Sequence, residues 1–274
     1  MNNNPLKQYF RRPAVYIKLP SEGKYYSPDV IDMTETGELP VYPMTAIDEI
    51  TARTPDALFN GVAVADLIKS CIPNIKDPWM VNSIDMDAIL IGIRAASNGS
   101  TMDIDSKCPE CETEATYGIN LVGILSSLKP GDYSKMLELG DLKIKFRPLL
   151  YKEMNQASMA QFEVQKTFNT AYTIDDEDQR NDEVKKALEK ITYLTMEILS
   201  QTIEYIQTPN SVVDDKQFIF DFLKNCDKDV YTQIRDYSTT LKADTELKPA
   251  EIICSNCNHK YDQPYAINPT DFFG

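Results

Sequence analysis

The sequence predicts an α+β protein: a small N-terminal antiparallel sheet with helices, then a four-cysteine ribbon that a mainly helical insertion splits in two. Three observations support this fold class. Alternating, turn-rich segments fill residues 13–43, apolar residues recur at helical spacing in much of the remainder, and four cysteines form two close pairs. We therefore expect an N-terminal α+β domain at 1–107, a split ribbon at 108–121 and 250–274, and an insertion at 122–249.

The N-terminal sheet is predicted from two short segments. Ala14–Leu19 alternates between apolar and polar residues, and the turn-forming Pro20–Gly23 follows it. A second turn at Thr34–Gly37 precedes the extended segment Leu39–Pro43. Two strands joined through such turns predict an antiparallel pair.

Helix start and stop signals divide the next part of the chain into four helices. The signals are Thr45 with Asp48 three residues on, Thr54 before Pro55, Asn60-Gly61 with a stop at Pro73, and Ser83 or Asp85 with a stop at Asn98-Gly99. The fourth helix, Met86–Ala96, is apolar on more than one face, so we expect it at the centre of the N-terminal core.

The insertion is predicted to be mainly helical, with one strand at Leu142–Leu149. The expected helices are Tyr151–Tyr172, Asp182–Gln207, Asp215–Asn225 and Asp227–Thr239. The second half of the second helix is apolar nearly all round, which fits either a core helix or one that docks on another chain. The acidic segment Asp175–Asp178 between the first two helices lacks the glycine and glutamate spacing of a calcium loop, so we interpret it as solvated.

The two cysteine pairs predict a zinc site. Cys108 and Cys111 are separated by two residues, as are Cys254 and Cys257, and a strand-like segment follows each pair. Two such turns can direct four thiolates at one metal ion, and a shell of four thiolates leaves no position for catalytic water. We expect one structural zinc ion per chain, held by Cys108, Cys111, Cys254 and Cys257.

Other interpretations of the cysteines are weaker. Disulfides need an oxidising compartment, and a thioredoxin-like motif needs one pair at the start of a helix. His259 could replace a thiolate ligand, but four thiolates make it a bystander in our interpretation. Cys71 and Cys226 lie in apolar helical patterns and are expected to be small buried core residues.

Composition and missing motifs argue against three classes of protein: nucleic-acid-binding proteins, membrane proteins and enzymes. The net charge is −14, which opposes nucleic-acid binding because phosphate would be repelled. No apolar segment is long enough to span a membrane and no signal peptide is recognisable, so we expect a soluble protein from a reducing compartment. Phosphate loops, serine elbows and zinc-protease motifs are missing and there is a single histidine, which predicts a protein that is not an enzyme.

Several motifs in the first 110 residues resemble those of a known family. They are Lys18–Gly23, Val41–Glu49, Thr54–Ala57, Asn60-Gly61, Ser70–Pro73, Asp85–Asp87, Ile93-Arg94 and Cys108–Cys111. Their order and spacing are similar to those of the baseplate hub and hub-assembly family of T-even-like contractile-tailed bacteriophages.

The resemblance implies a non-enzymatic phage tail protein that binds other baseplate or tail proteins. It implies a location either in the virion tail baseplate or, for an assembly factor, in the host cytoplasm. The motifs do not separate these two roles. A second hypothesis rests on the cysteine pairs alone: a zinc-ribbon regulator that binds nucleic acid or the host transcription apparatus.

Two local features complete the expectations. The residue after the second cysteine of such a turn tends to need positive φ, and here it is Glu112 or Asn258. Asparagine tolerates that geometry and glutamate tolerates it poorly, so strain is expected in the first turn. The chain ends with Asp271–Gly274, an apolar tail that either enters the core or docks on a partner.

Overall fold

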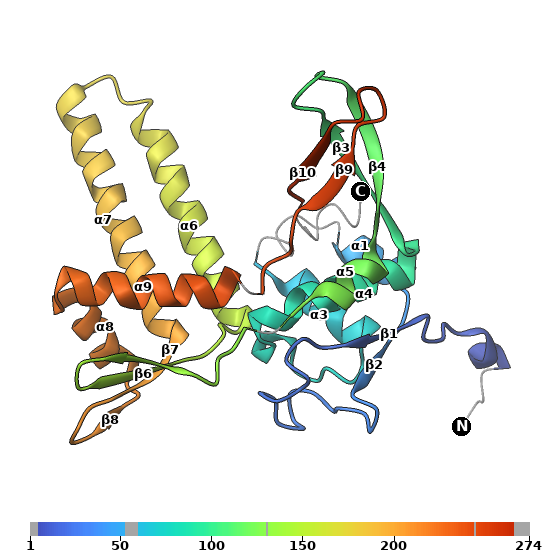
Figure 1. Cartoon of the computed structure of the whole chain (residues 1–274), viewed down its shortest axis with the longest axis horizontal. Helices are drawn as coiled ribbons and strands as arrows, with labels where there is room; N and C mark the ends of the chain where they lie inside the picture. Colours follow the sequence, from blue (N-terminus) through green and yellow to red (C-terminus); the bar gives the residue numbers. More distant parts are fainter. Residues whose placement is uncertain (1–4, 53–59, 130, 244, 266–274) are drawn as a thin grey trace. The chain divides into compact units, whose positions relative to one another are not determined.

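The computed structural model describes residues 5–52, 60–129, 131–243 and 245–265. The chain forms two compact units, one from residues 1–130 with 246–274 and one from residues 131–245 (Figure 1). Helices and small antiparallel sheets occur in the same chain, so the α+β prediction is confirmed. The expected helix start at Thr54 and the tail containing Phe272 and Phe273 lie outside the described residues.

The first unit contains all the N-terminal elements and both cysteine pairs. Its elements are η1 (Pro5–Tyr9), β1 (Val15–Lys18), β2 (Glu38–Val41), α1 (Ala46–Ala52), α3 (Val62–Cys71), η2 (Pro78–Met80), α4 (Ser83–Asn98), β3 (Thr101–Lys107), β4 (Glu114–Asn120), α5 (Leu121–Ser127), β9 (Ala250–Ile253) and β10 (Lys260–Gln263). The predicted N-terminal sheet is confirmed, because β1 and β2 pair antiparallel with Val15 opposite Val41.

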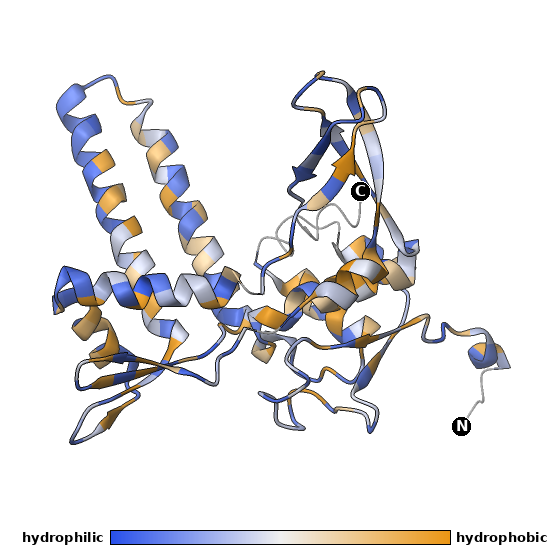
Figure 2. Ribbon diagram, viewed as in Figure 1, coloured by the Kyte–Doolittle hydropathy of each residue, from blue (hydrophilic) through white to orange (hydrophobic). Residues whose placement is uncertain are grey.

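Helix α4 is the centre of the first unit. It is buried along most of its length, and Figure 2 shows it and α5 largely in the hydrophobic colour. Gly92 lets β1 approach closely, since a Cβ there would lie 2.8 Å from Ile17 Cγ2. The helix begins earlier than predicted and Asn82 occupies the N-cap, so neither Ser83 nor Asp85 caps it.

Asp85 instead fixes the loop after β1. The residue is fully buried, and its carboxylate accepts hydrogen bonds from Ser21 N (2.8 Å) and the Tyr26 hydroxyl (2.5 Å). Burial raises the pKa of Asp85 above its ordinary value of 3.8. The loop is therefore tied to the central helix by a buried polar group.

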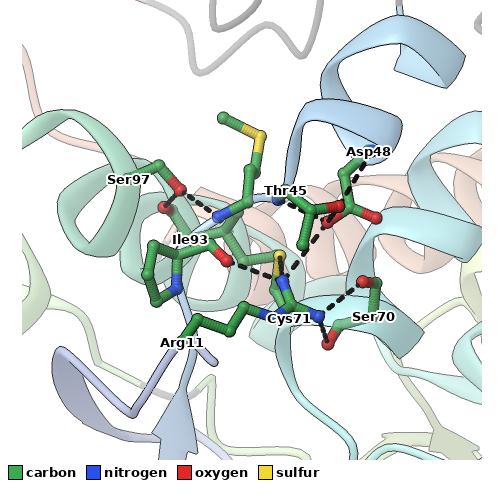
Figure 3. A network of polar contacts seen from close by, with 9 residues as sticks. Arg11, Thr45, Asp48, Ser70, Cys71, Ile93 and Ser97 are labelled. Carbon is green, nitrogen blue, oxygen red and sulfur yellow. Dashed lines mark hydrogen bonds and ion pairs between the residues drawn. The ribbon is translucent and has the colours of Figure 1, made fainter. Parts of the chain in front are cut away.

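A polar network around Arg11 joins the N-terminal segment to α1 and α3 (Figure 3). The Arg11 guanidinium donates to Pro43 O, to Asp48 Oδ2 and to the Ser70 carbonyl and hydroxyl, at 2.6 to 3.2 Å. Thr45 N donates to Asp48 Oδ2 (2.7 Å) and Asp48 N donates to Thr45 Oγ1 (3.2 Å), which confirms the predicted cap of α1. One arginine thus ties residues 11–14 to α1 and α3.

The second unit combines a four-stranded sheet with four helices. Its elements are β5 (Met136–Leu139), β6 (Leu142–Phe146), α6 (Tyr151–Ala171), α7 (Glu177–Thr202), β7 (Ile203–Gln207), β8 (Val212–Val213), α8 (Lys216–Asn225) and α9 (Lys228–Ala243). The strands pair antiparallel in the order β5-β6-β7-β8. Ile144, Phe146, Ile203 and Ile206 are buried, and Phe146 packs on Tyr237 with ring centroids 5.2 Å apart.

Two predictions in this unit were wrong. Residues 203–207 form a strand rather than the end of the helix, because Ile203 and Ile206 face Phe146 and Ile144 across the sheet. The helix also begins at Glu177 rather than at the expected Asp182, because Asp176 accepts a hydrogen bond from Gln179 N (2.9 Å) and caps α7. Residues 175–178 are exposed, in agreement with the solvated interpretation of this acidic segment. Acidic groups suit that end of a helix because its free N–H groups carry partial positive charge.

Candidate metal centre

Each cysteine pair lies in the turn of a β-hairpin. β3 and β4 pair from Thr101 opposite Asn120 to Lys107 opposite Glu114, and the first pair occupies the turn between them. β9 and β10 pair from Ala250 opposite Gln263 to Ile253 opposite Lys260, with the second pair in their turn. Each pair was predicted to precede a strand, and each is in fact framed by two strands.

The two turns have the same backbone hydrogen bonds. Cys108 N donates to Thr113 O (3.0 Å) and Glu112 N donates to Cys108 O (2.9 Å). In the second turn Cys254 N donates to His259 O (2.9 Å) and Asn258 N donates to Cys254 O (3.0 Å). Glu112 and Asn258 have φ values of 55° and 58°, as expected for the residue after the second cysteine. The equivalent bonds give both turns the same shape.

The two hairpins lie against each other (Figure 1). Their turns bring the four sulfurs together. Ser106 of β3 bonds to the Tyr261 hydroxyl (2.9 Å) and to Gln263 Oε1 (2.6 Å), both on β10. Across the hairpins, Cys108 Sγ lies 3.7 Å from Cys257 Sγ and Cys111 Sγ lies 3.6 Å from Cys254 Sγ. All four sulfurs lie within 4.8 Å of one another.

These distances fit a tetrahedral metal ion better than they fit disulfides. A tetrahedron with metal–sulfur bonds of about 2.3 Å has edges of about 3.8 Å, close to the two distances across the hairpins. A disulfide would need sulfurs about 2.05 Å apart, and all six cysteines are free. The arrangement can hold one thiophilic ion with all four positions filled by protein.

Hydrogen bonds around the sulfurs favour thiolates at two positions. The hydroxyl and the backbone of Thr113 lower the pKa of Cys111 to about 5. Backbone bonds from Cys257 and Asn256 lower the pKa of Cys254. The backbone bond at His259 also lowers the pKa of Cys257, but burial and the three neighbouring sulfurs raise it to about 12. Crowded sulfurs thus oppose complete ionisation, and a bound cation would remove that repulsion.

The sequence did not indicate two of the residues that surround the sulfurs. Asn256 Nδ2 lies 3.7 Å from Cys111 Sγ and 3.1 Å from Thr113 Oγ1. Thr113 Oγ1 itself lies 3.3 Å from Cys111 Sγ. Asn256 lies inside the second cysteine pair and Thr113 lies two residues after the first, and these positions are the only sequence signal for such a role.

The remaining candidate residues lie outside the sulfur cluster. His259 is exposed, its ring stacks on Tyr261 with centroids 6.1 Å apart, and its contacts within the turn are made by its backbone. Cys71 is fully buried in α3, as predicted. Cys226 is only partly buried and follows the last residue of α8, so its assignment to the core was wrong.

Within the part of the chain that the structure describes, the four cysteines are the only group of three or more His, Cys, Asp or Glu side chains that could hold a metal ion. None of the helices among those residues combines the length and hydropathy needed to cross a bilayer.

Comparison with known proteins places this fold and site in a family. No curated protein and no solved structure matches the chain. A family model described as T4 bacteriophage base plate protein matches residues 18–274, which includes both hairpins and the whole second unit. The chain therefore belongs to the T4 bacteriophage base plate protein family and is a structural component of a phage tail baseplate.

Proposed function

We propose that this chain is a non-enzymatic hub or hub-assembly protein of the baseplate and that one structural zinc ion fixes its first unit. The proposed zinc site is supported by the four sulfurs, which lie within 4.8 Å of one another. They belong to two turns that have equivalent hydrogen bonds. The residues that would hold the ion are Cys108, Cys111, Cys254 and Cys257. The ion would supply cross-linking only, since four thiolates leave no site for water.

The positions of the two cysteine pairs along the chain indicate a structural role for the zinc ion. Cys111 and Cys254 are 143 residues apart, and residues 131–245 form a separate unit between them. A zinc ion would join the segment before that unit to the segment after it, with a free energy on the order of 10 kcal/mol. We propose the split ribbon of 108–121 and 250–274 as this joint, and the mainly helical insertion of 122–249 as the part that binds other tail proteins.

The surface of the insertion supports the second part of this proposal. Helix α7 buries Leu199 at its end, whereas Leu188 and Ile191 in its middle are 53% and 40% exposed. Exposed apolar side chains that a partner could contact are therefore in the middle of α7, whereas the buried Leu199 agrees with the core alternative for the apolar segment that follows. In Figure 2 hydrophobic positions interrupt the otherwise hydrophilic outer turns of this helix.

Mass spectrometry of purified virions and of tail-assembly intermediates tests the baseplate role. Presence in finished virions indicates a hub component, and presence in intermediates alone indicates an assembly factor of the host cytoplasm. Absence from both contradicts the proposal.

The regulator hypothesis receives no support from the structure. The net charge of −14 remains unfavourable for phosphate binding. Binding to DNA or RNA in a gel-shift assay at low salt, with a steep loss as salt rises, would revive it.

A further inference from the structure

A groove of about 650 Å³ runs beside the two hairpins in the first unit. It is lined by four consecutive residues of β4, Tyr117 to Asn120, by all four residues of β9, by one side of α5 and by Tyr265. Side chains of successive strand residues point to opposite faces of a sheet. A groove against one face would therefore be lined by every second residue, whereas consecutive residues of β4 and β9 line this groove, so both strands border it with their edges.

Among the described residues, β4 and β9 each have one edge to which no other strand pairs. Among the described strands β4 pairs only with β3, and β9 pairs only with β10. The bond from Cys108 N to Thr113 O fixes which positions of the first hairpin are hydrogen-bonded pairs, and these alternate along an antiparallel ladder. The backbone groups of Gly118 consequently point away from β3.

The same reasoning applies to the second hairpin. The bond from Cys254 N to His259 O means that Ile252 with Tyr261, and Ala250 with Gln263, are the hydrogen-bonded pairs of this ladder. The backbone groups of Glu251 and Ile253 therefore point away from β10. All three residues line the groove. The groove is therefore bordered by backbone donors and acceptors that repeat every second residue.

The groove is also apolar between its edges. Ile124 of α5 and Ile252 of β9 are buried at its base, and Ile253 on its rim is 54% exposed. Gly118 has no side chain, and a Cβ there would lie 3.0 Å from Thr101 Cγ2 of the paired strand β3. Repeating backbone groups beside an apolar base match an extended peptide, because a helix satisfies its backbone internally.

We propose that this groove binds an extended segment of another tail protein, which adds as a strand to the exposed edge of β9 or β4 and places apolar side chains at alternate positions over Ile124 and Ile252. The four residues of β9 span roughly 13 Å at about 3.3 Å per residue, so four or five residues of the partner are held. This inference rests on the proposed baseplate role and assigns it a second binding surface, separate from α7.

Two neighbouring serines provide a matched test. Ser127 lines the groove and Ser126 does not. Both are exposed, and both hydroxyls donate to a carbonyl of the same helix, at Ile124 (2.8 Å) and Val122 (2.9 Å) respectively. Ser127→Trp places a large side chain in the groove where the partner segment would lie, and we expect at least a tenfold loss of incorporation into tail-assembly intermediates with an unchanged melting temperature. Ser126→Trp should be incorporated like the native chain.

Hydrogen exchange identifies the mode of binding. The amides of Gly118, Glu251 and Ile253 should exchange fast in the isolated full chain and at least ten times more slowly in the assembled intermediate. Unprotected amides in an assembly that contains the chain, or equal incorporation of the two tryptophan variants, would overturn this inference and leave the baseplate role intact. Protection already present in the isolated chain would mean that its own residues fill the groove, which also overturns it. Absence of the chain from all assemblies would defeat the baseplate role itself.

Discussion

Glu112 occupies a backbone position that glutamate tolerates poorly. Its φ of 55° matches the 58° of Asn258 in the other turn, so the shape of the turn determines the conformation of both residues. The Lys107–Glu112 ion pair, at 3.2 Å, is largely exposed and adds little. The strain expected from the sequence is therefore located at one residue of the metal centre.

Glu112→Gly should stabilise the metal-loaded chain by about 1 kcal/mol, because glycine adopts positive φ without a steric penalty. Asn258→Gly is the matched control and should change stability less, since asparagine already tolerates this conformation. Urea denaturation of the three proteins measures the difference. A gain for Asn258→Gly as large as that for Glu112→Gly would show that φ strain is not the cause.

Asp85 gives the first unit a predictable pH dependence. Because burial raises its pKa, the carboxyl group's contribution to folding is fully present below 3.8 and is lost as the pH rises through the raised value. The native chain should therefore lose stability relative to Asp85→Asn as the pH increases over that interval. Denaturation of both proteins between about pH 4 and pH 8 checks this, and a native chain that gains stability relative to Asp85→Asn as the pH rises would contradict it.

At the scale of elements, close packing determines whether a helical glycine can be replaced by alanine without loss of stability. A Cβ at Gly92 in α4 would lie 2.8 Å from Ile17 Cγ2, whereas the nearest atom to a Cβ at Gly123 in α5 is Asn120 Cγ at 3.7 Å. We expect Gly92→Ala to destabilise the protein by about 1 kcal/mol, since overpacking exceeds the gain in helix propensity. Gly123→Ala should stabilise it by about 0.5 to 1 kcal/mol. Thermal denaturation of the two variants tests the packing of β1 on α4, and stabilisation by both would contradict it.

Much of the element order could be predicted from local signals. The Thr45–Asp48 cap, the stop before Pro73 and the helix near Asp215–Asn225 are visible in the sequence because each depends on a few neighbouring residues. Residues 203–207 were assigned to a helix because Ile203 and Ile206 continue its apolar spacing. Pairing with β6, which is distant in sequence, makes them a strand instead, and single-sequence periodicity does not contain that contact.

In the candidate site, too, local features could be predicted from the sequence and contacts between distant residues could not. The clustering of the four cysteines could be predicted because the spacing within each pair is itself a sequence feature. Strand β3 was missed because its inward residues, Met102 and Ile104, are separated by acidic residues and only partly buried. The contacts of Asn256 with Cys111 and Thr113 depend on how the two hairpins meet, which no local pattern encodes.

At the scale of the whole molecule, the zinc ion would connect segments that the second unit separates along the chain. Cys254→Ser should remove one of four thiolates, release zinc and lower the melting temperature by about 10 °C or more. Cys226 and His259 lie outside the cluster, so Cys226→Ser and His259→Ala should leave the zinc content and the melting temperature close to the native values. Calorimetry with metal analysis of each variant checks this, and zinc loss in the His259 variant would show that the histidine is a ligand.

The central claim is that two distant cysteine pairs hold one shared ion. X-ray absorption at the zinc edge, combined with elemental analysis of the reduced chain, measures this directly. We predict one zinc per chain with four sulfur neighbours at about 2.3 Å. A chain purified without zinc, or a zinc ion with fewer than four sulfur neighbours, would contradict the account.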